Sequence, residues 1–149
     1  MRRFVLLAAV IALGGMADAH KPDPKVLAYT LPDQIQWKES AEIPGVEYAN
    51  MVGDPSKPGL YIQLIRWQPF HMSHPHYHLR DRFITVISGT WWVGTGRKFD
   101  PDSTTPMPAG SFVVHYGNQV HYDGAKDEQA IIEITGEGPG TPIMVTEEK

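Results

Sequence analysis

The stretch HMSHPHYHLRDRFITVISGTWWVG occupies residues 71–94 of a chain of 149 residues, and four of the seven histidines lie in its first eight positions. His74, His76 and His78 have the same parity, so on an extended strand their side chains point to one face. Neighbouring members of such a series are about 6–7 Å apart at Cα, which lets two imidazoles reach one metal ion. The outer two are about 13 Å apart and cannot both reach it on a straight strand.

A third ligand must therefore come from elsewhere in the chain. Apart from His20 at the N-terminus, the histidines outside the cluster and its N-terminal flank are His115 and His121, which are the candidates for this ligand. His71 and His115 are interpreted as structural or rim groups.

On both sides of this stretch, short segments alternate apolar and polar residues and are separated by Gly, Pro, Asn and Asp. They are rich in β-branched and aromatic residues, and no window after the N-terminus has helical periodicity. Many short strands at such spacing predict an all-β sandwich or barrel. The expected strands are VLAYTL (26–31), IQWKE (35–39), VEYANMV (46–52), YIQLIRW (61–67), RFITVIS (82–88), TWWVG (90–94), GSFVVHY (110–116) and AIIEITG (130–136).

Composition limits the classes of function. A hydrophobic content of 42% and a charged content of 20% are typical of one globular domain. The formal net charge of −4, without a basic stripe, argues against nucleic acid as a partner. The absence of cysteine excludes disulfides, thiolate nucleophiles and zinc–thiolate sites.

The N-terminus has the pattern of a signal peptide. Arg2 and Arg3 precede an apolar run over residues 4–16, and residues 17–19 (Ala-Asp-Ala) have the form of a cleavage site. We therefore predict a periplasmic or secreted protein with no membrane anchor after cleavage. The predicted organisation is a signal peptide (1–19), an N-terminal arm with one or two short strands (20–45), a β-barrel domain (46–145) and a frayed tail (146–149).

The histidine stretch resembles the first motif of the cupin superfamily, which reads HxH, three or four residues, Glu, six residues, Gly. Here His76-Tyr77-His78 is followed after three residues by Arg82 and after six more by Gly89. The later run PMPAGSFVVHYGNQVHYDGAKDEQAIIEITGEGP is similar to the stretch that carries the second cupin motif, whose last ligand corresponds to His121. The resemblance covers residues 61–142 and implies a single-domain cupin-type double-stranded β-helix, or jelly-roll barrel.

Two departures from the family pattern matter. Arg82 replaces the glutamate ligand, and Tyr116-Gly117-Asn118 replaces the usual Pro-x-Gly. A guanidinium cannot bind a metal, so the site is either a three-histidine centre with open positions or a former metal site that now holds something else. Arg82 could bind an anionic ligand beside the metal, or pair with Asp81, Asp123 or Glu133.

An alternative register uses His74-Pro75-His76. It restores a carboxylate at Asp81 but displaces Gly89 by one position. We therefore expect His76, His78 and His121 to bind the metal, with His74 as the alternative.

Nitrogen ligands without thiolates suit Fe(II), Mn, Ni, Cu or Zn, and three protein ligands leave positions for water or substrate. The resemblance to cupins implies oxygenase, isomerase, decarboxylase or lyase chemistry on a small organic molecule, and a homodimer. The leading hypothesis is an exported metal-dependent enzyme with Arg82 and Glu133 as catalytic candidates. Glu133 is either a base facing the barrel interior or a residue of a solvated strand face. The alternatives are a non-catalytic metal-binding or small-molecule-binding cupin, and a metal-free cupin with a degenerate site.

Overall fold

The computed structural model describes residues 21–146, so the predicted signal peptide and residues 147–149 lie outside the described residues. The chain divides into two units, with the boundary between Asp33 and Gln34. In the described residues before this boundary, only the start of a 3-10 helix, η1 (Pro32–Gln34), is regular structure. Within residues 21–146, none of the helices has the length and hydrophobicity needed to cross a membrane.

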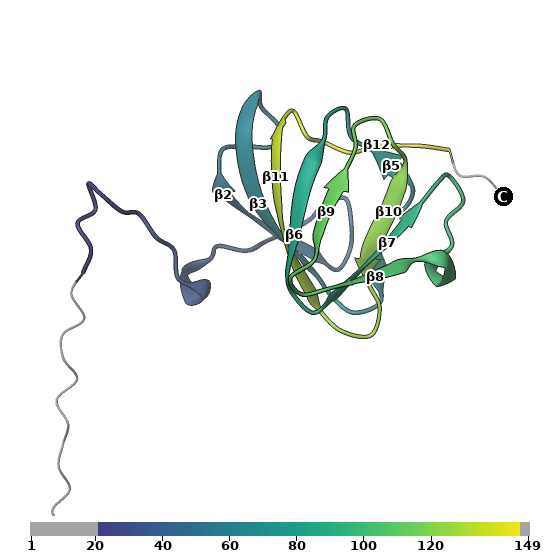
Figure 1. The fold of residues 1–149 in the computed structure, drawn as a ribbon, viewed down its shortest axis with the longest axis horizontal. Coiled ribbons are helices and arrows are strands. Elements are labelled where there is room, and N and C mark those ends of the chain that lie inside the picture. The colour runs from purple at the N-terminus through teal and green to yellow at the C-terminus, as the bar shows by residue number, and fades with distance from the viewer. Residues whose placement is uncertain (1–20, 147–149) are drawn as a thin grey trace, which may run out of the picture. The chain divides into compact units, whose positions relative to one another are not determined.

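The second unit consists of two antiparallel sheets that face each other (Figure 1). The first sheet has the order β1-β2-β3-β11-β6-β9. Its strands are β1 (Lys38–Glu39), β2 (Val46–Val52), β3 (Gly59–Trp67), β11 (Ala130–Gly138), β6 (Arg82–Ser88) and β9 (Phe112–His115).

The second sheet has the order β12-β5-β10-β7-β8, and a further strand, β4, also pairs with β10. Its strands are β12 (Ile143–Met144), β5 (His76–Tyr77), β10 (His121–Ala125), β7 (Thr90–Thr95), β8 (Thr105–Pro108) and β4 (His71–Met72). A short 3-10 helix, η2 (Pro101–Ser103), precedes β8.

Alternation of side chains places the core between the sheets. In β6, Arg82, Ile84 and Val86 are buried while Phe83 and Thr85 are exposed. The largest core side chains are contributed by both sheets, because each sheet turns one face inward. They include Tyr61, Trp67, Trp91, Ile84, Ile132 and Ile134.

Gly89 makes the tight turn from β6 to β7. Its φ of +69° is a left-handed conformation, and a Cβ here would lie 2.0 Å from the backbone oxygen of Gln129. Only glycine fits this position, which explains why the motif glycine follows the predicted strand 82–88.

The prediction of an all-β fold is confirmed, and five predicted strands correspond closely to β2, β3, β6, β7 and β11. The strand predicted at 26–31 is wrong. The amide groups of Val26 and Leu27 instead donate to the backbone oxygen of Asp23, which forms a turn.

The strand β10 was not predicted because all five of its residues are buried, so its sequence does not alternate. Residues 99–100 help to cover its outer side: the Tyr122 hydroxyl donates to the backbone oxygen of Asp100 over 3.0 Å, and the ring of Phe99 packs against Tyr122.

Candidate metal centre

Strand pairing in the second sheet brings the distant histidines together. His76 of β5 lies directly opposite His121 of β10, and their ring centroids are 4.5 Å apart. His78 follows β5, and its ring lies 5.1 Å from His76 and 5.6 Å from His121. All three side chains are buried, and each offers one ring nitrogen within 4.8 Å of the others. These three residues therefore form a group that can hold a metal ion.

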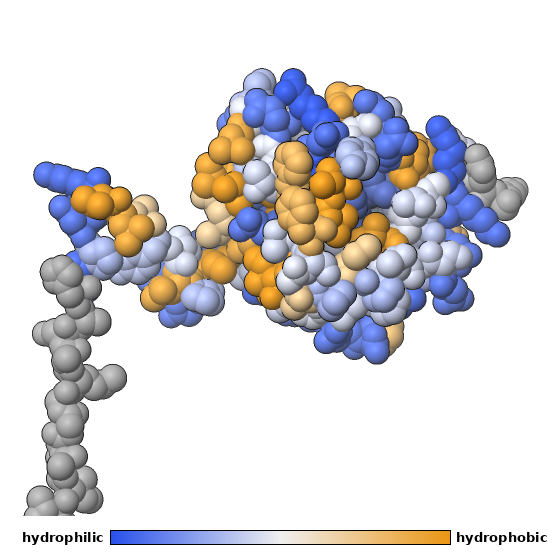
Figure 2. Space-filling model, in the orientation of Figure 1, coloured by the Kyte–Doolittle hydropathy of each residue, from blue (hydrophilic) through white to orange (hydrophobic). Residues whose placement is uncertain are grey.

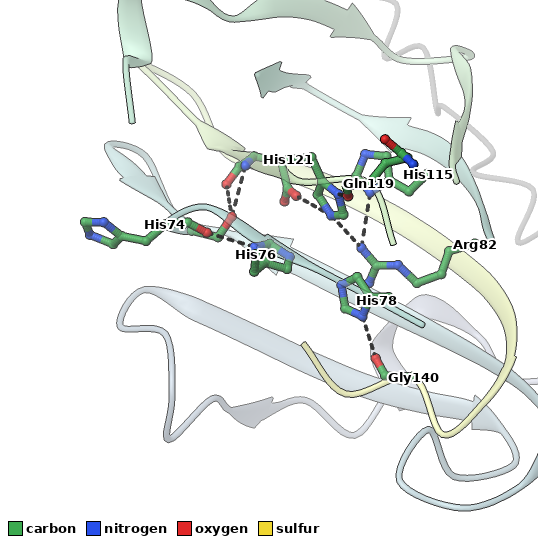
Figure 3. Close-up of polar contacts among 10 residues, drawn as sticks. His74, His76, His78, Arg82, His115, Gln119, His121 and Gly140 are labelled. Carbon is green, nitrogen blue, oxygen red and sulfur yellow. Dashed lines mark hydrogen bonds and ion pairs between the residues drawn. The ribbon is translucent and has the colours of Figure 1, made fainter. Parts of the chain in front are cut away.

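Backbone carbonyls orient the three rings (Figure 3). The Nδ1 atom of His76 lies 2.8 Å from the oxygen of His74, that of His78 lies 2.8 Å from the oxygen of Gly140, and that of His121 lies 3.0 Å from the oxygen of Gln119. A carbonyl oxygen only accepts, so each Nδ1 must donate. Each neutral ring therefore keeps its lone pair on Nε2, the tautomer that a metal requires.

Burial keeps these histidines neutral. Loss of hydration lowers the pKa of His76, and it lowers the pKa of His78 to about 2 and that of His121 to about 3. The positive charge of Arg82 lowers the same pKa values further. The rings are consequently deprotonated at neutral pH, as metal ligands must be.

The first sheet places a second group of side chains against these histidines. Arg82 of β6 is buried and lies opposite His115 of β9. Its Nη2 atom donates to Nδ1 of His115 over 3.2 Å and to Nε2 of His121 over 3.3 Å (Figure 3). The rings of His115 and His121 are also in contact, with centroids 3.8 Å apart. His115 therefore belongs to the site.

Asp123 places a negative charge beside this group. Its carboxylate is buried, and Oδ2 lies 3.9 Å from Nε2 of His121. Burial raises the pKa of Asp123, and the nearby His76 and Arg82 oppose this effect. Burial conversely lowers the pKa of Arg82, opposed by Asp123 and by the hydroxyl of Tyr61. Asp123 and Arg82 thus stabilise each other's charged forms.

A cavity of about 440 Å³ lies inside the barrel and reaches the site. Its lining includes the apolar side chains of Trp67, Trp91 and Ile132 and the polar side chains of His78 and Arg82. The dimensions and the mixed lining suit a small organic molecule.

The structure places the other predicted site residues outside the centre. His74 is exposed, its ring packs 4.7 Å from that of Phe99, and it points away from the cluster. Of the two orientations considered for Glu133, the structure shows the solvated strand face and not the interior one. Glu133 alternates with the buried Ile132 and Ile134, which line the cavity, so it lies on the outer face of β11.

Two of the residues in the site were misjudged or left open by the sequence analysis. His115 is buried and does not lie at the rim, and strand pairing with Arg82 places it inside the site. Asp123 was one of three alternatives for Arg82; its position two residues after His121, on the same face of a strand, was the available signal. Asp81 instead accepts a hydrogen bond from the backbone amide of Gly117 over 2.7 Å.

The three histidines fit a metal ion, provided that one hydrogen bond present in this structure is broken. The buried Nε2 of His78 has no hydrogen-bond partner among residues 21–146, which leaves an acceptor that a metal would satisfy. The Nε2 of His121, however, already accepts from Arg82. A metal held by all three histidines would therefore have to replace that hydrogen bond.

No family model matches the sequence, and neither does any curated protein. Solved structures do match. The polyketide cyclase RemF from Streptomyces resistomycificus has a TM-score of 0.64 at 10% identity, over 81% of this chain and 88% of that one. A cupin-2 domain protein from Rhodospirillum rubrum has a TM-score of 0.59 at 17% identity, over 81% of both chains. KdgF from a Halomonas species has a TM-score of 0.57 at 16% identity, over 74% of this chain and 95% of that one.

These likenesses confirm the cupin assignment at the level of the fold. The predicted jelly-roll barrel is therefore correct, and the three histidines lie on it as a group able to bind a metal.

Proposed function

We propose that this protein is an exported cupin that binds a divalent transition metal through His76, His78 and His121 and converts a small organic molecule in the barrel. The observation that carries the proposal is the backbone anchoring of all three rings. Three Nδ1 atoms donate to carbonyl oxygens, and the three ligand nitrogens converge. Three hydrogen bonds of this kind, on three rings in one group, orient ligands before the metal arrives.

The bound metal would supply Lewis acidity or an activated water. The chain itself supplies the binding cavity. Trp67 and Trp91 offer apolar walls for the carbon skeleton of a substrate, and Arg82 at the polar end offers N–H donors for an anionic group. The likeness to RemF, a polyketide cyclase, supports a small organic substrate.

A second candidate function is a metal-free cupin that binds a small molecule. The hydrogen bond from Arg82 to Nε2 of His121 favours it, because this bond uses a nitrogen that the metal would need.

The deciding experiment is the metal content of the mature protein, purified without a His tag, for the native sequence, His78→Ala and His121→Ala. The proposal predicts about one equivalent of one metal in the native protein and a loss in both variants. His74→Ala is the matched control, since that side chain points away from the site, and it should retain the metal. A native protein that is empty and cannot be reconstituted would favour the metal-free candidate.

Export is proposed from the pattern of residues 1–19 alone. The mass of the protein recovered from the periplasm of an expressing bacterium tests it. Cleavage after Ala19 predicts a mature chain beginning at His20, whereas recovery of the protein only in the cytoplasmic fraction, with Met1 intact, would contradict the proposal.

We also propose a homodimer, formed through the outer face of β6 and β9. Phe83, Ile87 and Phe112 are exposed there, and the rings of Phe83 and Phe112 stack with centroids 6.5 Å apart. Figure 2 shows hydrophobic residues gathered over these strands. A contiguous apolar face on a last strand is suited to a second copy of the same sheet. Sedimentation of the native protein and of Phe112→Glu tests this: the native protein should be dimeric and the variant monomeric.

A further inference from the structure

Arg82 and a metal ion would require the same atom. An imidazole that donates through Nδ1 has one acceptor, the lone pair of Nε2. In His121, Nδ1 donates to the oxygen of Gln119, and Nε2 accepts from Nη2 of Arg82 at 3.3 Å. The lone pair that would bind a metal is therefore occupied by the guanidinium in this structure.

The Nη2 atom of Arg82 also lies beside a second group of potential metal ligands. His115, His121 and Asp123 form a second group whose ligand atoms lie within 4.8 Å of one another, and Nη2 of Arg82 donates to both histidines. These are neutral nitrogens and a carboxylate, the groups that commonly surround a bound cation. The protein's own guanidinium is thus the cation that this second group holds.

Burial makes the competition strong. Arg82 is only 9% exposed, and the guanidinium remains charged in proteins. A divalent ion beside it would be repelled with little screening by solvent, and Asp123 is the described carboxylate that offsets this repulsion. The three histidines therefore bind a divalent metal ion more weakly than their geometry alone implies.

We infer that Arg82 is an internal competitor for the metal: it occupies Nε2 of His121 in the metal-free protein and must leave that atom when a metal binds. The inference rests on the proposed metal function. Once displaced, the Nη2 donor is available to an oxygen of a bound ligand, so metal binding and release of Arg82 are one event.

The test is Zn²⁺ affinity measured by competition with a chromogenic chelator, for the native protein and for Arg82→Met. Methionine has a similar length but carries neither charge nor donor, so the variant should bind Zn²⁺ at least tenfold more tightly. Arg66→Met is the matched control. Arg66 pairs with Glu47 at 3.1 Å and lies over the ring of Trp37, away from the cavity, so its replacement should leave Zn²⁺ affinity unchanged.

The single variant Arg82→Met leaves the Asp123 carboxylate buried without Arg82, which could prevent folding. The double variant Arg82→Met/Asp123→Asn avoids this problem, because it removes both buried charges together. It should also bind Zn²⁺ more tightly than the native protein, since the competing donor is gone.

Equal or weaker Zn²⁺ binding by the folded Arg82 variants would overturn the inference and leave the metal function standing. Binding by the variants but not by the native protein would support the inference and refute the proposed metal function of the native chain. Absence of binding in every protein would overturn both.

Discussion

The two sheets hold their parts of the site in different ways. On the second sheet, His76, His78 and His121 are each tied to a backbone carbonyl through Nδ1. On the first sheet, Arg82 and His115 form hydrogen bonds with side chains, and the buried Nε of Arg82 and Nε2 of His115 have no hydrogen-bond partner within the described part of the chain.

The second sheet therefore sets the geometry of the site, and the first sheet sets its charge. Backbone anchors fix where the three imidazoles point, and they persist as long as the strands pair. The position of Arg82 depends instead on Asp123, Tyr61 and two neutral histidines. The second sheet therefore provides a preformed set of ligands, whereas the first sheet provides a positive charge whose position can change.

The largest effect is expected where the charge balance is broken. Asp123→Asn removes the carboxylate and leaves Arg82 buried without a negative partner. We expect the free energy of unfolding to fall by about 3 kcal/mol, because an uncompensated buried charge is costly. Chemical denaturation of the metal-free protein measures this. A loss below about 1 kcal/mol would show that the carboxyl of Asp123 does not balance Arg82.

Acidification should act on the anchored histidines. The folded-state pKa values of about 2 for His78 and about 3 for His121 lie below the unfolded value near 6.5. Stability from these groups is therefore complete above pH 6.5 and declines as the pH falls, because the unfolded chain takes up protons first. At pH 5, each of these two histidines should lower the free energy of unfolding by about 2 kcal/mol relative to its value above pH 6.5.

The raised pKa of Asp123 acts in the opposite sense, so the effect of one histidine is isolated by a variant. Denaturation of the metal-free native protein and of His78→Asn at pH 7.5 and pH 5 provides the measurement. The variant should lose about 2 kcal/mol less over this interval. Identical losses in the two proteins would show that His78 is not held neutral by the fold.

A smaller effect is expected from moving one anchor. A Cβ on Gly140 would lie 2.6 Å from the hydroxyl oxygen of Tyr61, which is buried, so Gly140→Ala must shift either the Tyr61 ring or the backbone whose carbonyl holds His78. We expect metal affinity to fall about tenfold, as for other groups that orient a ligand. Thr141→Ala, at the next position in the cavity wall, is the control. Unchanged affinity in Gly140→Ala would mean that the anchor is dispensable.

The smallest effect is expected on the outer face of the barrel. Glu133→Gln makes the same kind of change as Asp123→Asn but at a half-buried side chain that points away from the cavity. Stability should change by less than about 0.5 kcal/mol, and metal content should not change. Loss of metal in this variant would restore Glu133 as a member of the site.

Predictability of the strands depended on how each strand is covered. The segment 82–88 became β6 as predicted, since one face is buried and the other exposed. The segment 26–31 has a similar pattern but pairs with no described strand, and Val26 remains 84% exposed. Alternation is thus compatible with a strand, but a partner is needed to form one. The opposite error occurred in β10, whose burial on both sides erased the pattern.

The candidate site was predictable where local geometry governs it. The spacing of His76 and His78 implied a shared direction, and both are buried beside His121. The neighbours of Arg82 were not predictable, because His115 is 33 positions away and reaches it through strand pairing.

By itself, the sequence determined the β class, the strand that carries Arg82, and the histidines with the spacing of metal ligands. These features are local, since a period of two and the reach of a side chain follow from a few consecutive residues. Tertiary structure alone decided that Arg82 and the metal would share Nε2 of His121, and that Asp123 supplies the opposing charge. Such contacts join strands of different sheets, and their energies depend on burial, which arises only when the two sheets pack together.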